Sequence, residues 1–240
     1  MPIRRLDQAL SARGFGSRRE VCTLIRAGLV RVNGMAAYKG DQKIDLECDA
    51  VTVRGEEVCL REFVYIMLHK PKGVVSASRD ANAPTVLDLL PQTLRRRGLF
   101  PVGRLDKDTT GLLLITDDGA LAHGLLSPRR HVPKIYLAGL RTPAEPEDAA
   151  AFAQGMHLPP AEGHPPEDCL PAELILLEGN RARVVLHEGK YHQVRRMFAA
   201  LGNEVLALHR ESMGALRLDE ALAPGQCREL TEEEAEGLRG

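Results

Sequence analysis

The stretch "GRLDKDTTGLLLITDDG" at residues 103–119 joins a charged turn to an apolar run. Asp106 lies two residues after Arg104 and directly before Lys107, and "GLLLIT" follows at 111–116. A short apolar run bounded by turn residues is typical of a buried strand. The sequence therefore places one carboxylate among cations just before such a strand. Two interpretations fit this pattern: a single reactive acid, or a salt-bridged turn without a function.

Outward from this strand, helices and strands follow one another without a regular βαβ alternation. Helices are expected at 85–90, 120–126 and 193–202. Strands are expected at 63–68, after the Lys-Pro-Lys-Gly turn (70–73), and at 134–140, 172–179, 181–189 and 204–218. Such an order predicts an α+β fold whose sheet is mixed and largely antiparallel, with flanking helices. This domain is expected to span residues 61–240.

Residues 142–171 differ in composition from the rest of that domain. They contain seven prolines and six acidic residues, with no Lys or Arg. Proline and acidic clusters are typical of loops. Most of this segment is therefore expected to be an exposed insertion that does not touch nucleic-acid phosphates.

Residues 1–60 are expected to form a small basic module. Leu6, Ala9 and Leu10 have helical spacing, and Ser17 with Glu20 has the spacing of a capping box before a second helix. Asn33-Gly34 is a strong hairpin signal. Residues 1–40 hold eight Lys or Arg against two acids, whereas residues 218–240 hold seven acids against two arginines. The basic end is thus expected to meet a polyanion.

Composition narrows the class of protein. A length of 240 residues with 44 % hydrophobic residues suits two soluble domains. No apolar run approaches the ~18 residues of a membrane helix, and the start lacks the apolar segment of a secretory signal. Five scattered cysteines without a Cys-x-x-Cys pair favour reduced thiols and a cytoplasmic location. No large spare apolar stripe is evident, so a monomer is expected.

Cofactor and metal motifs are absent from the sequence. Neither a phosphate-binding G-x-x-x-x-G-K-[ST] loop nor a G-x-G-x-x-G turn occurs. His187 and His192 are five residues apart, whereas zinc on one helical face needs a spacing of four. No metal and no cofactor are expected. A cofactor-free enzyme and a binding protein both remain open.

Four segments resemble, in order, the pseudouridine synthases of the RsuA/RluB/RluE/RluF group, and the N-terminus resembles the S4 RNA-binding domain that usually precedes them. The segments are "HKPKGVVSA" (69–77), "GRLDKDTTGLLLITDDG" (103–119), "KIYL" (134–137) and "EGKYHQVRRMFAALGNEVLALHR" (188–210), behind "RRLDQALSARGFGSRREVCTLIRAGLVRVNG" (4–34). Within the group, "YHQVRRMFAALGN" is most similar to the members that act on small-subunit (16S) rRNA. Large-subunit relatives tend to carry Asn-Arg in place of Tyr191-His192.

The resemblance implies that a uridine in RNA is isomerised to pseudouridine without a cofactor or metal. Asp106 is then the reactive carboxylate, and Arg195 is the partner that keeps it charged and fixes its orientation. Tyr136 would stack on the uracil or take the C5 proton, although the strand pattern fits a core side chain equally well. Attack on the sugar C1′, attack on the ring and a glycal intermediate are left open.

The reaction needs a nucleotide that has left its stack, so the resemblance also implies RNA contacts. Arg104 would hold the duplex open or contact phosphate. Lys70 and Lys72 would contact RNA near the cleft. The S4-like module would bind phosphates through Arg18, Arg19 and Arg26.

The expected substrate is one uridine of 16S rRNA, conventionally uridine 516, in free RNA or in a small-subunit assembly intermediate. One alternative keeps the chemistry and moves the target to 23S rRNA. The other is a non-catalytic RNA-binding or ribosome-assembly protein, which the basic module alone would satisfy.

Overall fold

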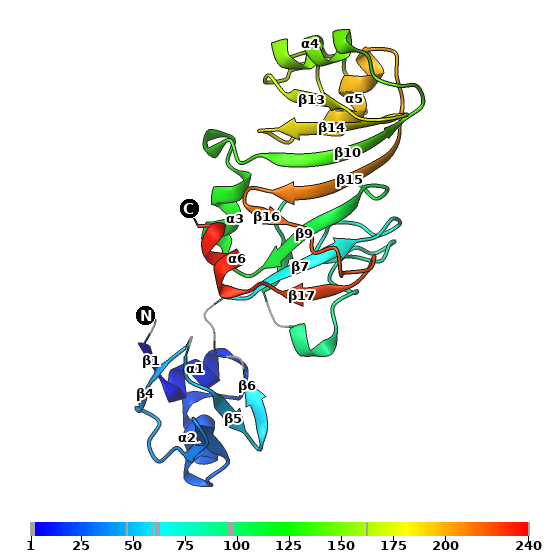
Figure 1. The fold of residues 1–240 in the computed structure, drawn as a ribbon. Helices are drawn as coiled ribbons and strands as arrows, with labels where there is room; N and C mark the ends of the chain where they lie inside the picture. Colours follow the sequence, from blue (N-terminus) through cyan, green and yellow to red (C-terminus); the bar gives the residue numbers. More distant parts are fainter. Residues whose placement is uncertain are drawn as a thin grey trace. The chain divides into compact units, whose positions relative to one another are not determined.

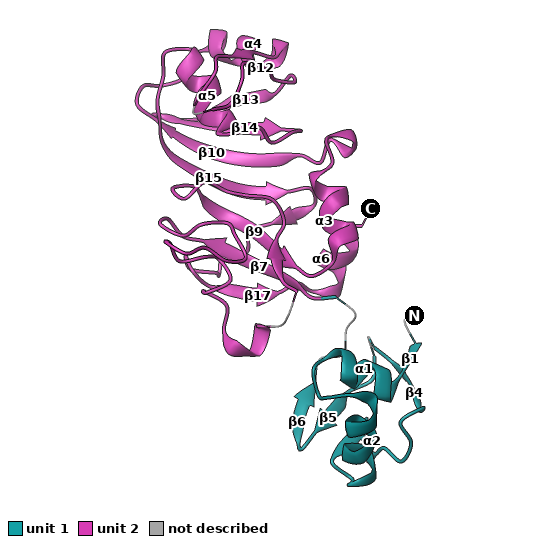
Figure 2. Cartoon of the chain, turned by 180° about the vertical axis from the view of Figure 1, so that it is seen from behind, with its two compact units in different colours: residues 1–63 teal, residues 64–240 magenta. Residues whose placement is uncertain are grey.

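A computed structural model describes residues 3–46, 48–58, 60, 63–95, 98–161 and 163–239. The chain forms two compact units, residues 1–63 and 64–240 (Figure 2). The sequence predicted a domain boundary between residues 60 and 61.

Unit 1 is a small α+β body. Its elements are β1 (Ile3–Arg5), α1 (Leu6–Ala12), α2 (Arg18–Arg26), β2 (Val30–Val32), β3 (Met35–Ala36), β4 (Lys43–Asp45), β5 (Val51–Val53) and β6 (Glu56–Val58). The predicted capping box is present: Ser17 caps α2, and the Glu20 side chain accepts from the Ser17 backbone N–H at 2.7 Å. β2 and β3 pair around Asn33-Gly34, as the hairpin signal predicted. Leu6, Leu10 and Val21 are fully buried in the core beneath.

Unit 2 is built on one nine-stranded sheet. In space the strands follow the order β13-β14-β10-β15-β9-β7-β17, with β16 on β15 and β8 on β9 (Figure 1). β9 and β15 are parallel, and the other pairings are antiparallel, so the predicted mixed, largely antiparallel sheet is confirmed. No helix in the described part of the chain is long and apolar enough to cross a membrane.

The bounds of the unit 2 elements are as follows. The strands are β7 (Tyr65–Lys70), β8 (Phe100–Pro101), β9 (Thr110–Thr116), β10 (Lys134–Leu140), β11 (His157–Leu158), β12 (Glu167–Asp168), β13 (Glu173–Leu176), β14 (Arg181–Leu186), β15 (Val205–Met213), β16 (Leu216–Arg217) and β17 (Cys227–Glu229). The helices are η1 (Gln92–Leu94), α3 (Gly119–Leu126), η2 (Pro128–Arg130), α4 (Pro146–Gln154), α5 (Gln193–Ala200) and α6 (Glu232–Gly237).

Two hydrophobic clusters of unit 2 meet at Tyr136. One cluster joins α4 and α5 to β10, β13, β14 and β15, with Phe152 and Phe198 fully buried and their rings 5.0 Å apart. The other joins β7 and β9 to the loops that follow β7 and precede β9. Tyr136, half-buried on β10, packs against both. The middle of the sheet is therefore where residues from both halves of the domain meet.

The parallel pair at the centre of the sheet requires a glycine. Gly111 at the start of β9 has φ +106°, and a Cβ placed there would lie 2.3 Å from the Arg210 carbonyl oxygen of β15. Only glycine allows the two backbones to approach so closely. The packing of β9 against β15 therefore requires glycine at position 111.

Three expected elements differ in the structure. Residues 85–90 form a turn, in which the Asp88 carboxylate accepts from the Thr85 N–H at 2.7 Å, and the N–H groups of Asp88 and Leu90 bond to carbonyls three residues back, at 3.1 and 3.3 Å. After the Lys-Pro-Lys-Gly turn, Val75 makes an isolated bridge to Thr85, and no strand forms there. The segment 142–171 is no simple exposed loop, since it contains α4 and the β11–β12 pair and buries Phe152 completely.

Candidate active site

Asp106 lies in the connection between β8 and β9. Its carbonyl accepts from the Thr109 N–H at 3.0 Å, which closes a tight turn. Leu105, the preceding residue, is buried, and its N–H donates to the Ser76 Oγ at 3.0 Å. The backbone of Asp106 is therefore fixed, while its side chain stays 31 % exposed. This combination suits a carboxylate that must keep its position and still meet another molecule.

Lys70 is buried and bonds to this turn, whereas the sequence predicted that it contacts RNA. Its side chain is fully buried, and its Nζ donates to the carbonyls of Pro71 (3.0 Å), Lys107 (3.3 Å) and Thr109 (2.9 Å). Burial lowers the pKa of Lys70 to about 8, against the opposing attraction of Asp106 and Asp108. The prediction of a phosphate contact at Lys70 is wrong, because its three protons point at backbone oxygens inside the domain.

Two basic side chains from the α5 region face the Asp106 carboxylate. Arg195, in the first turn of α5, places its Nε 3.9 Å from Oδ2, while its Nη1 donates to the Val205 carbonyl at 2.8 Å. His192, at the N-cap of α5, places its Nε2 3.3 Å from Oδ1. The structure thus brings Arg195 to Asp106, as expected, and adds His192.

The sequence did not indicate His192 as a site residue: its spacing from His187 does not suit zinc, and Tyr191-His192 served only to distinguish the two groups of relatives. Its backbone has φ +46° and ψ 34°, the left-handed conformation that few residues other than glycine adopt. No pattern in the sequence marks a left-handed histidine. In the described part of the chain, no group of three or more His, Cys, Asp or Glu side chains is placed to hold a metal ion.

The carboxylate opens onto a small pocket of about 80 Å³, which also borders Arg104, Tyr136, Lys190 and His192. Tyr136 reaches it from β10, and Arg104 is exposed at its edge. The pocket thus gathers a carboxylate, a phenol, an imidazole and two cations from three separate parts of the chain. Such a set can attack or deprotonate an anionic, aromatic substrate held against the tyrosine.

The other expected RNA contacts are on exposed surfaces. Lys72 is exposed in the turn after β7. In unit 1, Arg19 and Arg26 are exposed on α2, and Arg18 is half-exposed but donates to Asp7 at 3.1 Å. Burial alone would raise the pKa of Asp7, yet the guanidiniums of Arg5 and Arg18 hold that pKa below its ordinary value. Arg18 therefore also has a structural role.

The chain is similar to known proteins over nearly its whole length. Residues 64–169 match the RNA pseudouridylate synthase family, and residues 4–37 match the S4 domain. A Bacillus subtilis (strain 168) protein named "Uncharacterized RNA pseudouridine synthase YtzG" is 47 % identical over 96 % of each chain. The chain belongs to the RNA pseudouridine synthases. The predicted family, the predicted enzyme class and the predicted S4 domain are thereby confirmed.

Two further comparisons extend over nearly the full length of this RNA pseudouridine synthase. The "Ribosomal small subunit pseudouridine synthase A" of Salmonella typhimurium is 48 % identical over 96 % of this chain and 97 % of that protein. A solved structure described as "Crystal structure of pseudouridylate synthase" superposes with a TM-score of 0.67 and 39 % identity, covering 98 % of this chain and 99 % of the other. The fold is therefore shared with a solved pseudouridylate synthase.

Proposed function

We propose that this enzyme isomerises one uridine of small-subunit (16S) rRNA to pseudouridine, with uridine 516 as the target. Relatives from Salmonella typhimurium and Vibrio cholerae, 48 % and 42 % identical, are named as synthases of the small ribosomal subunit. The observation that carries the proposal is the Asp106 carboxylate, fixed between His192 and Arg195 at a pocket that Tyr136 also lines.

The reaction rearranges bonds within one nucleotide. The bond between C1′ and N1 breaks, the uracil turns, and C1′ bonds to C5; C5 loses its proton and N1 gains one. Nothing is oxidised and no group is imported, so the reaction needs neither a metal nor a cofactor. Asp106 is the group that attacks or deprotonates, and the pocket geometry is compatible with attack on the sugar or on the ring.

Arg195 and Tyr136 have separate roles in this proposal. Arg195 orients the Asp106 carboxylate from α5, since its Nε lies 3.9 Å from Oδ2 while its Nη1 is held by the Val205 carbonyl. Tyr136 stacks on the uracil or accepts the C5 proton. Tyr136 packs against both hydrophobic clusters, which keep its ring in place. In this proposal it is therefore both a core side chain and a substrate contact.

RNA binding supplies the energy that opens the substrate. Extruding a nucleotide costs a few kcal/mol, which contacts away from the pocket must offset. Arg104 at the pocket edge, Lys72 near it, and Arg19 and Arg26 of the S4 domain are exposed and suited to phosphate contact. Arg18 can contribute while it holds Asp7. We further propose a cytoplasmic monomer that accepts free rRNA or a small-subunit assembly intermediate.

The test is tritium release from 5-tritiated 16S and 23S rRNA by the wild-type enzyme and by Asp106→Asn. Release from 16S rRNA alone, lost in the variant, supports the proposal. Release from 23S rRNA overturns the proposed target and keeps the chemistry. Full release by Asp106→Asn overturns the role of Asp106. If neither free RNA reacts, the same assay on small-subunit assembly intermediates decides between that substrate and a protein that only binds RNA.

A further inference from the structure

His192 is the basic side chain nearest to Asp106 among the ion pairs of the described residues. Its Nε2 lies 3.3 Å from Oδ1, whereas Arg195 lies 3.9 Å from Oδ2 and donates to a backbone carbonyl. The two side chains therefore face different oxygens of the same carboxylate. Because a basic group faces each oxygen, the carboxylate rotates less freely than it would beside one cation alone.

The ring of His192 is the last of three stacked rings. His192 and Tyr191 have centroids 4.0 Å apart and planes 14° apart, and Tyr191 and His164 have centroids 3.9 Å apart and planes 12° apart. The outermost ring, His164, comes from the segment between β11 and β12 and is exposed. The stack thus connects that segment to the Asp106 carboxylate.

The backbone of His192 also needs support from its surroundings. A left-handed, non-glycine residue persists only where neighbouring contacts determine its conformation, and such residues concentrate at functional sites. The side chain of Gln193 supplies part of this support: its Oε1 accepts from the Lys190 N–H at 3.0 Å, and its Nε2 donates to Glu188 at 2.7 Å. The loop of residues 188–192 is thereby closed on the start of α5.

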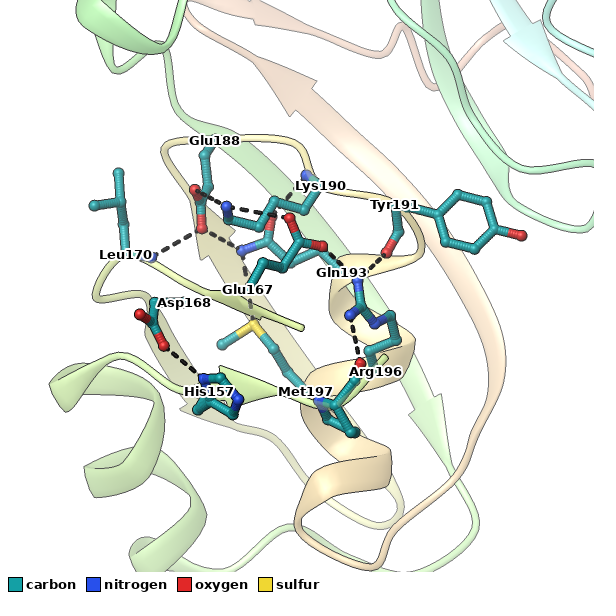
Figure 3. Close-up of polar contacts among 11 residues, drawn as sticks. His157, Glu167, Asp168, Leu170, Glu188, Lys190, Tyr191, Gln193, Arg196 and Met197 are labelled. Atoms are coloured by element: carbon teal, nitrogen blue, oxygen red, sulfur yellow. Dashed lines mark hydrogen bonds and ion pairs between the residues drawn. The ribbon is translucent and has the colours of Figure 1, made fainter. Parts of the chain in front are cut away.

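Arg196 fastens the β11–β12 segment to this loop (Figure 3). Its Nη1 donates to Glu167 at 2.5 Å and to the Tyr191 carbonyl at 3.2 Å, and its Nη2 donates to the Pro159 carbonyl at 2.7 Å. Hydrogen bonding to Arg196 lowers the pKa of Glu167, so the pair stays charged. Glu188 adds a bond to the Leu170 N–H at 2.9 Å. The segment is thus bound to the loop that carries His192 at several points.

We propose that His192 is a positioning residue for the Asp106 carboxylate, and that the stack with Tyr191 and His164 holds His192 in place. The proposal rests on the proposed function, since it assigns Asp106 the reactive role. It gives the acidic, proline-rich segment a part in catalysis without any contact to RNA phosphate.

The test compares four single variants by steady-state tritium release from 5-tritiated rRNA. Asn tolerates the left-handed conformation, so His192→Asn removes the imidazole without new backbone strain. Because misplacement of a reacting group by about 1 Å can cost about 10²-fold, we expect kcat to fall by about tenfold to a hundredfold in this variant. KM for rRNA should stay within about threefold of the wild type, since RNA contacts are unchanged.

His164→Ala removes the outer ring and should lower kcat, by less than His192→Asn. The matched control is His157→Ala on the same segment, since His157 pairs with exposed Asp168 and takes no part in the stack. This control should match the wild type. Because His164 is exposed, its variant is testable even if His192→Asn does not fold.

Three outcomes overturn the inference: unchanged kcat in a folded His192→Asn, unchanged kcat in His164→Ala, or a rise in KM alone, which would make the rings an RNA contact. Asp106→Asn is the fourth variant. If it retains full tritium release, the reactive role that the proposed function gives to Asp106 fails. If it is inactive while His192→Asn equals the wild type, only the inference about His192 fails.

Discussion

Replacement of buried Lys70 by methionine separates a structural role from RNA binding. Hydrogen bonds to a charged group contribute ~1.5–3 kcal/mol each, so the three carbonyl bonds of Lys70 contribute about 5–9 kcal/mol. Burial opposes them: the fall of the pKa from 10.5 to about 8 corresponds to a cost of about 3 kcal/mol. Lys70→Met removes both effects, and we expect unit 2 to lose about 2–6 kcal/mol of unfolding free energy.

The assay is urea denaturation followed by circular dichroism, with the transitions of the two units fitted separately. Lys72→Met is the matched control, because that side chain is exposed two residues away. Tritium release should show a lower kcat for Lys70→Met, since the Asp106 turn loses its support, and an unchanged KM for rRNA. Unchanged stability combined with a raised KM would refute this reasoning and restore Lys70 as an RNA contact.

The pH dependence of the same pair of proteins gives a second check. Between pH 8 and pH 10.5, the unfolded chain holds a proton on Lys70 that the folded chain has lost. The unfolding free energy contributed by Lys70 should therefore rise with pH across this range. The difference between wild type and Lys70→Met isolates this contribution. A difference that does not change with pH would contradict the lowered pKa of Lys70.

Three further predictions test the fold and the S4 domain. Gly111→Ala should destabilise unit 2 by more than about 3 kcal/mol, because the new Cβ meets the Arg210 backbone; Gly189→Ala, which faces open space, is its control in thermal denaturation. Unit 1 should lose stability as the pH falls below about 4, because Asp7 then binds a proton in the unfolded chain more readily than in the fold, where its pKa is lower. Asp7→Asn, measured by acid titration, should reduce this loss. Arg19→Glu with Arg26→Glu should weaken rRNA binding and flatten its dependence on salt concentration, as phosphate contacts release counterions; an unchanged slope in filter binding would remove these arginines from the interface.

The sequence predicted secondary structure correctly where a pattern of a few neighbouring residues is compatible with one local structure. Ser17 and Glu20 define a helix start, Asn33-Gly34 defines a hairpin, and the apolar run 111–115 occupies β9 as expected. The helix expected at 193–202 is α5 (Gln193–Ala200), which buries Val194, Met197 and Phe198. These patterns depend on neighbours a few residues apart, which a sequence displays directly.

Composition misled the interpretation of residues 142–171. Seven prolines suggested a loop, but Pro146 is in the first turn of α4, where a missing N–H costs nothing, and Glu145 with Asp148 caps that helix. The burial of Phe152 depends on strands that are distant in sequence, so no local pattern reveals it.

At the site, the sequence indicated which residues lie together better than it indicated how buried each of them is. Asp106 and Arg195 are brought together, and Tyr136 lines the same pocket. Lys70 was assigned to RNA, together with Lys72, from the family resemblance, and its burial depends on the backbone oxygens of a turn 37 residues away. His192 was missed because its position depends on a left-handed backbone and on rings from two segments.

The parallel pairing of β9 with β15 also bears on how the protein is synthesised. Asp106 precedes β9, whereas Arg195 and His192 precede β15, so the two sides of the pocket are separated by about half of unit 2 along the chain. Contacts between distant segments form late, because a long loop must close first. During translation, the S4 domain can fold and bind RNA while the later strands are still being made. We therefore expect a nascent chain to remain inactive until β15 has left the ribosome, so that modification begins only with a nearly complete enzyme.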